Sequence, residues 1–226
     1  MTDLRVHYPK RSIYHLTDYV IDLLSIINDL GWNQCDLVGH SLGAGICSIF
    51  SATFPEKVNR LILIDGIGPV SHEDQKVLGQ LRKAGSFYLG RKVDTGIASR
   101  GYASWDQLID SRQSAGPLKT ESAELLMRRA ATERFGQVFV ESDRRLKEPS
   151  FAYMSQGQVC HILSGIESPT LLIQALSGFI IERSTTLERI GSIADISVVN
   201  LPGNHHLHMD APESVAHEID QFLRSK

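Results

Sequence analysis

Ser41 stands between Gly39 and Gly43 in the stretch LVGHSLGAGICSIF, residues 37–50. An apolar run precedes it and another follows, so the pattern G-x-S-x-G falls between an expected strand and an expected helix. Such a turn raises the serine hydroxyl above the sheet, and side chains at 39 or 43 are expected to clash there. The pattern predicts a nucleophilic serine, with the backbone N–H of Leu42 placed to hold an oxyanion.

A serine nucleophile needs a base, and the stretch LPGNHHLHMDAPE offers three histidines. His205 follows the last expected strand and precedes the last expected helix, where a base of this kind is found, and His206 is the alternative. His206, His208 and Asp210 also alternate in a way that suits a metal ion. The sequence offers no second cluster of ligands, so we expect no metal site.

The acid that orients the histidine is expected at the end of a strand. After the strand PTLLIQ the chain reads ALSGFI, and Gly178 stands where an aspartate would be expected. Asp65 ends an earlier apolar run, and the carboxyl ends of parallel strands meet at one crevice. We therefore expect Asp65 to be the acid, with Glu182 as the alternative. The alternative to a catalytic role is that Asp65 only begins an Asp-Gly turn.

The elements that must position these residues follow a strand–helix–strand rhythm, which predicts an α/β fold with a parallel sheet. Apolar runs without polar alternation predict buried strands, and helical spacing of apolar residues predicts the helices between them. The expected strands are 35–40, 60–65, 169–176 and 196–202, and the expected helices are 12–31, 41–55, 185–191 and 212–226.

Residues 70–165 have a different character, with amphipathic helical stretches and no strand-like apolar run. We interpret them as a helical cap inserted over one end of the sheet, which either acts as a lid or packs without moving. The expected organisation is a first part of the core at 1–69, the cap at 70–165, and a second part of the core at 166–226.

The composition excludes several classes of function. A net charge of −3 provides no basic field for nucleic acid, and no apolar run is long enough for a membrane span. The three cysteines suit neither a disulfide framework nor a zinc spacing, which is typical of a cytoplasmic protein. No dinucleotide fingerprint is present, and the expected chemistry requires no cofactor.

The chain resembles an α/β-hydrolase, and more narrowly the serine hydrolase-like protein family. The matching stretches are YHLTDYVIDLL, LVGHSLGAGI, LILIDGIGP, FAYMSQGQV, SPTLLIQALSGFI and LPGNHHLHMDAPE. The resemblance implies an α/β-hydrolase fold with a helical cap, Ser41 as nucleophile, His205 as base and Asp65 as acid. It also allows a peroxisomal location, although the C-terminal Arg-Ser-Lys stops short of the Ser-Lys-Leu signal.

The chain departs from that family at its beginning. Family members start with several strands and carry a His-Gly motif that completes the oxyanion hole, whereas residues 1–12 are too short for either. We therefore expect a truncated form with impaired activity, since loss of one oxyanion donor costs about 10²–10³ in rate. Strand 35–40 would then be an exposed apolar edge that allows self-association.

The leading hypothesis is a serine hydrolase of esters or related acyl compounds, acting through an acyl-enzyme. Thioesterases, acyltransferases and carbon–carbon bond hydrolases share the same three residues. The alternatives from other classes are a non-catalytic small-molecule binder with the same fold and an interaction protein that pairs through its edge strand.

Overall fold

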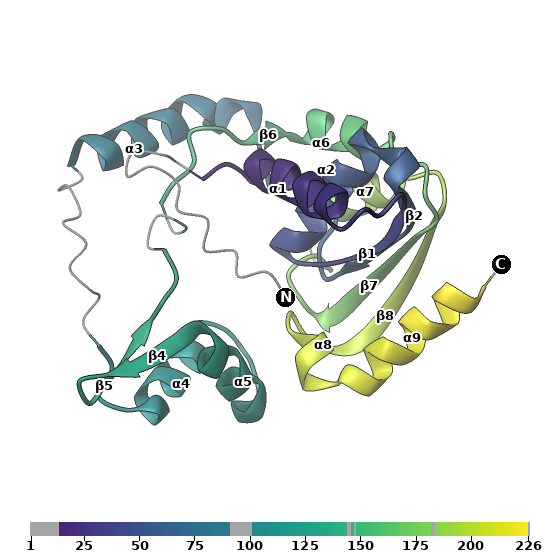
Figure 1. Cartoon of the computed structure of the whole chain (residues 1–226). Coiled ribbons are helices and arrows are strands. Elements are labelled where there is room, and N and C mark those ends of the chain that lie inside the picture. Colours follow the sequence, from purple (N-terminus) through teal and green to yellow (C-terminus); the bar gives the residue numbers. More distant parts are fainter. Residues whose placement is uncertain (1–13, 91–100, 144–145, 147, 182–183, 226) are drawn as a thin grey trace.

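The computed structural model describes residues 14–90, 101–143, 146, 148–181 and 184–225, and a four-stranded parallel sheet with the order β1-β2-β7-β8 lies at its centre (Figure 1). The strands are β1 (Cys35–His40), β2 (Val58–Ile64), β7 (Thr170–Ser177) and β8 (Ile196–Asn204). The four predicted strands and their parallel pairing are confirmed. The apolar runs of β2 and β7 are buried because helices cover both faces of the sheet.

Five helices cover the sheet. Those that pack on one face are α1 (Leu16–Asp29), α2 (Leu42–Thr53), α6 (Gln156–Leu163) and α7 (Ser184–Ile190). The opposite face is covered by α9 (Pro212–Arg224), drawn in yellow in Figure 1. Two apolar clusters result, one centred on Phe50 and Leu63 and the other on Ile62 and Ile173. Burial of these side chains is the main favourable term in folding.

Glycine and proline residues mark the ends of three of the helices. Gly31 adopts a φ of +67° just beyond α1, a conformation that glycine enters without strain. Helix α2 ends one residue before Phe54, and Pro55 then begins a short 3₁₀ helix, η1 (Pro55–Lys57). Pro212 occupies the first turn of α9, where its missing N–H costs nothing.

Strand β1 is an edge of the sheet within the part of the chain that the structure describes, since it pairs with β2 alone. Val38 on this strand is 54% exposed, whereas Leu37 is buried against the helices. The exposed apolar edge is therefore present among the described residues. Self-association through it stays a prediction, and residues 1–13, on which the expectation of missing strands rests, lie outside the described part.

The segment between β2 and β7 leaves the sheet, because these two strands are direct neighbours although about a hundred residues separate them. Besides α6, which packs on the sheet, the described part of this segment contains α3 (Val77–Gly90), α4 (Trp105–Ser114) and α5 (Thr120–Ala130). A short 3₁₀ helix, η2 (Asp74–Lys76), precedes α3, and two-residue strands β3 (Ser71–His72) and β6 (Met154–Ser155) pair at the base of the segment.

The prediction of an all-helical segment is wrong after Ala130. Strands β4 (Ala131–Arg134) and β5 (Gln137–Val140) form an antiparallel hairpin there. Phe135 and Gly136 both have positive φ, which is the geometry of the two-residue turn that suits a hairpin. Figure 1 shows the hairpin with α4 and α5 as a body beside the sheet, on the side of α8 (Leu207–Asp210). None of the described helices is long and apolar enough to cross a membrane.

Candidate active site

Ser41 occupies the sharp turn between β1 and α2. Its backbone has φ +54° and ψ −113°, a strained conformation for a residue with a side chain. The Ser41 N–H donates to the carbonyl oxygen of Ile64 on the neighbouring strand at 3.1 Å, which fixes the turn against the sheet. Leu42 begins α2, so its N–H is one of the helix's unpaired first donors.

The two glycines of the motif differ in what surrounds them. A Cβ on Gly39 would lie 2.5 Å from the carbonyl oxygen of Gly43 and 2.8 Å from the Cα of Ala44, so glycine is required there. A Cβ on Gly43 would meet nothing within 4 Å among the described residues. The prediction of a clash at Gly43 is therefore wrong, because the approach in this turn is made by the Gly43 backbone toward Gly39.

Ser41, His205 and Asp65 lie in a hydrogen-bonded row. His205 Nε2 lies 2.8 Å from the Ser41 hydroxyl, and His205 Nδ1 lies 2.6 Å from Asp65 Oδ2. The three residues come from the ends of β1 and β2 and from the loop between β8 and α8, which all meet at one edge of the sheet. Residues that lie 140 and 164 positions apart in the chain are thus brought into direct contact.

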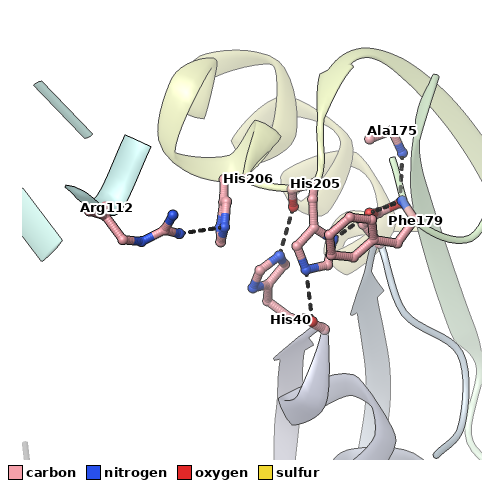
Figure 2. Close-up of polar contacts among 8 residues, drawn as sticks. His40, Arg112, Ala175, Phe179, His205 and His206 are labelled. Atoms are coloured by element: carbon pink, nitrogen blue, oxygen red, sulfur yellow. Dashed lines mark hydrogen bonds and ion pairs between the residues drawn. The ribbon is translucent and has the colours of Figure 1, made fainter. Parts of the chain in front are cut away.

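Asp65 is almost fully buried, with 1% of its surface exposed, and its backbone φ is +41°. Besides His205, its carboxylate accepts hydrogen bonds from the N–H of Phe179 at 3.0 Å and of Ala175 at 3.3 Å (Figure 2). Burial alone would raise the pKa of Asp65. The hydrogen bonds from His205, Phe179 and Ala175 outweigh burial and hold the pKa below its usual value, so the carboxylate stays ionised.

The His205 ring is held from several sides. Figure 2 shows it against the ring of Phe179, and their centroids lie 4.1 Å apart in a stacked arrangement. The backbone of His205 is held as well, because its carbonyl oxygen accepts a hydrogen bond from His40 Nε2 at 2.7 Å. His206, the alternative base, instead accepts from the Arg112 guanidinium at 2.8 Å. Glu182, the alternative acid, lies outside the described residues.

A cavity of about 290 Å³ opens onto this row. Its wall includes Ser41 and His205 together with the apolar side chains of Leu42, Ile67 and Phe179. A small, mostly apolar cavity with a few convergent polar groups is the usual form of a site for a small organic molecule.

Arg189 on α7 anchors the loop that follows Asp65. It is buried and donates to the carbonyl oxygens of Ile67 at 2.7 Å and Pro69 at 2.9 Å. It also donates to Ser71 and Gln156, which lie where the segment 70–165 leaves and rejoins the sheet. Its planar guanidinium can serve several acceptors at once, so it fixes the cavity wall and the base of the insertion together.

The residues that support the row differ in whether the sequence alone could have revealed them. His40 could have been found, since it adjoins Ser41 and a strand's end faces the same crevice. Phe179 and Arg189 carried no pattern that distinguishes them from ordinary apolar and surface residues, and only the fold reveals their contacts.

A family model described as the alpha/beta hydrolase fold matches residues 8–212, and the chain belongs to this family. A serine hydrolase-like protein of Danio rerio is 27% identical over 230 residues, covering 98% of this chain and 70% of the relative. Serine hydrolase-like protein 2 of Homo sapiens is 29% identical over 239 residues, covering 98% of this chain and 75% of the relative. The resemblance to the serine hydrolase-like proteins is thereby confirmed.

Solved structures agree on the fold. A hypothetical protein from Pseudomonas aeruginosa superposes with a TM-score of 0.87 at 28% identity, covering 97% of this chain and 78% of that one. The thioesterase domain from the curacin biosynthetic pathway gives a TM-score of 0.75 at 22% identity, covering 91% and 73%. The predicted α/β-hydrolase fold class is confirmed, and the family supports a hydrolase.

Proposed function

We propose that the chain is a serine hydrolase of small esters or related acyl compounds, with Ser41 as nucleophile, His205 as base and Asp65 as acid. The observation that carries the proposal is the continuous hydrogen-bonded row from Ser41 through His205 to Asp65. A neutral histidine in such a row accepts the serine proton at Nε2 while its Nδ1–H stays bound to the carboxylate.

In the proposed reaction Ser41 Oγ attacks the acyl carbon as His205 takes its proton. The tetrahedral intermediate places its negative charge near the first turn of α2, where the Leu42 N–H is the proposed donor. His205 then gives the proton to the leaving alcohol, and an acyl-enzyme remains on Ser41. Water activated by His205 releases the acid and restores the serine.

The strained backbone at Ser41 and the ionised state of Asp65 support these roles. A nucleophile held in an unfavourable turn stays exposed to substrate, and a carboxylate with a lowered pKa stabilises the imidazolium that forms. The cavity size favours short acyl groups, because about 290 Å³ lies at the lower end of small-molecule sites.

We propose in addition that residues 70–165 form the cap of this site, between core segments 1–69 and 166–226. Contacts of α4 with His206 and of the start of α5 with α8, both next to His205, support this role. Lys119 N donates to Asp210 Oδ1 at 3.1 Å, and the Ser122 hydroxyl donates to the carbonyl oxygen of Met209 at 3.2 Å.

Covalent labelling by a fluorophosphonate probe tests the proposal, since the probe reacts only with an activated serine. We expect the wild-type chain to be labelled and Ser41→Ala to be unlabelled, with turnover of p-nitrophenyl acetate following the same pattern. The control is Ser25→Ala, because this exposed serine on α1 donates to the carbonyl oxygen of Ile21 and lies outside the row and the cavity wall. A folded wild-type chain that resists the probe would favour a non-catalytic binding role.

A further inference from the structure

Three histidines meet beside the hydrogen-bonded row. His40 ends β1, His206 precedes α8, and His208 lies within α8. One ring nitrogen from each lies within 4.8 Å of the other two, and all three residues are half-buried. The sequence pattern grouped His206 and His208 with Asp210, whereas the fold groups these two histidines with His40, from a strand about 166 residues away. We propose that His40, His206 and His208 bind one divalent transition-metal ion.

The hydrogen-bond partners of these rings determine where their lone pairs lie. The carbonyl oxygen of His205 only accepts, so His40 Nε2 carries the hydrogen and its Nδ1 is left with a lone pair. A histidine that donates one N–H to a backbone carbonyl while its other nitrogen is free has the arrangement found in metal ligands.

His206 and His208 also have a ring nitrogen that could act as a metal ligand. The Arg112 guanidinium only donates, so His206 Nε2 must present its lone pair (Figure 2). His208 Nδ1 is buried and has no hydrogen-bond partner among the described residues, which makes it a group that a ligand would satisfy. The set therefore offers the Nδ1 lone pair of His40, the unsatisfied Nδ1 of His208, and an Nε2 lone pair of His206 that Arg112 now occupies.

The geometry needs a limited adjustment. Nitrogens of a tetrahedral zinc site lie about 3.3 Å apart, given Zn–N bonds of about 2.0 Å. Binding therefore requires the three side chains to rotate, so that nitrogens now within 4.8 Å of one another move closer together. Three neutral imidazoles with a fourth position left to water suit Zn²⁺, and imidazole ligands also suit Ni²⁺ and Cu²⁺.

Arg112 competes with the metal, because its cationic side chain already occupies the lone pair of His206. A bound ion must displace this contact between Arg112 on α4 and His206. Replacing Arg112 with glutamine should therefore tighten metal binding. Zinc bound by an unrelated pair of surface histidines would not respond to this replacement.

Zn²⁺ titration of the full, untagged chain by calorimetry tests the site. We expect one tight site in the wild type, and weakening by more than about tenfold in His206→Gln and in His208→Gln. His217→Gln is the matched control, since among the described residues this exposed histidine on α9 is hydrogen-bonded to its helix neighbour Gln221 and lies outside the group of three. Arg112→Gln should bind more tightly than the wild type.

Thermal unfolding with and without Zn²⁺ provides a second readout that does not depend on catalysis. The metal should raise the melting temperature of the wild type and of His217→Gln, and should leave that of His208→Gln unchanged. Equal zinc affinity in wild type, His206→Gln and His208→Gln would overturn the site. So would a loss of affinity in Arg112→Gln. A loss of esterase activity alone concerns the proposed function and not this site.

Discussion

Gly178 lies directly against the carboxylate of Asp65, and no side chain fits between them. A Cβ built on Gly178 would collide with both carboxylate oxygens and would lie 2.6 Å from the carboxylate carbon. A glycine therefore follows β7, because the Asp65 carboxylate, which follows β2, fills the space beyond the end of β7. The position after β7 at which an aspartate would be expected thus holds glycine for a steric reason, and the Asp65 carboxylate reaches the same place from the end of the neighbouring strand.

Gly178→Ala should displace Asp65 and weaken its bond to His205. We expect a loss of activity of at least about a hundredfold, since misplacing a catalytic group by about 1 Å has this cost. Ester turnover by the variant and by Gly79→Ala measures the effect. Gly79 lies on α3 with open space around it, so its replacement should leave turnover unchanged.

Gly39 and Gly43 should respond differently to alanine. Gly39→Ala places a methyl group against the Gly43 backbone and should destabilise the fold by about 1–3 kcal/mol, the usual cost of overpacking. Gly43→Ala meets open space and should change the free energy of unfolding by less than about 1 kcal/mol. Urea unfolding of both variants measures the difference, and equal losses would contradict the steric distinction.

Asp65→Asn should keep the fold and lose most of the activity. The amide cannot hold His205 in the tautomer that accepts the Ser41 proton, and a change of this kind lowers kcat about 10⁴-fold in serine hydrolysis. We expect KM to change little, because the carboxylate lies behind His205. Steady-state kinetics separates the two constants, and near-normal kcat would exclude Asp65 as the acid.

Stability should fall in mild acid because of His206 and His208. Their pKa values are lowered to about 4 in the folded chain, against 6.5 ordinarily. The unfolded chain therefore binds more protons between these values. The stabilisation is fully present above about pH 6.5 and is lost as the pH falls toward 4.

Melting temperatures of the wild type and of His208→Gln, measured with a chelator across this range, test the assignment. The variant should lose less stability than the wild type as the pH falls. Parallel curves would show that other groups control the acid sensitivity.

Self-association through the edge of β1 is a further prediction. An exposed apolar edge with unpaired backbone groups favours pairing with a second copy. Light scattering after size exclusion should show dimers that grow with concentration, and Val38→Lys should reduce them. Leu187→Lys, at an exposed apolar site on α7, is the control, and monomers at all concentrations would exclude this use of the edge.

The sequence predicted the sheet, its flanking helices and the three residues of the row, because each depends on a local signal. The apolar runs before Ser41 and Asp65 indicate where those side chains leave the sheet. Because the carboxyl ends of parallel strands meet at one edge, the two side chains were expected to lie close together. The hairpin after Ala130 escaped prediction because its strands are only four residues long, and the first of them, Ala131–Arg134, carries polar residues that suit a helix equally well. His40 and Arg189 act through contacts across long stretches of chain, which spacing along the sequence does not encode.

The loop after β7 binds Asp65 through the backbone N–H of Phe179, while the side chains of Phe179 and Ile180 line the cavity. Backbone donors are the same for almost every amino acid, so a new side chain at position 180 can reshape the cavity while this hydrogen bond stays in place. Positions 178 and 179 lack this freedom, because the Asp65 carboxylate fills the space beside Gly178 and the Phe179 ring stacks on His205. One short loop thus joins a position that can alter the cavity to two positions on which the hydrogen-bonded row depends.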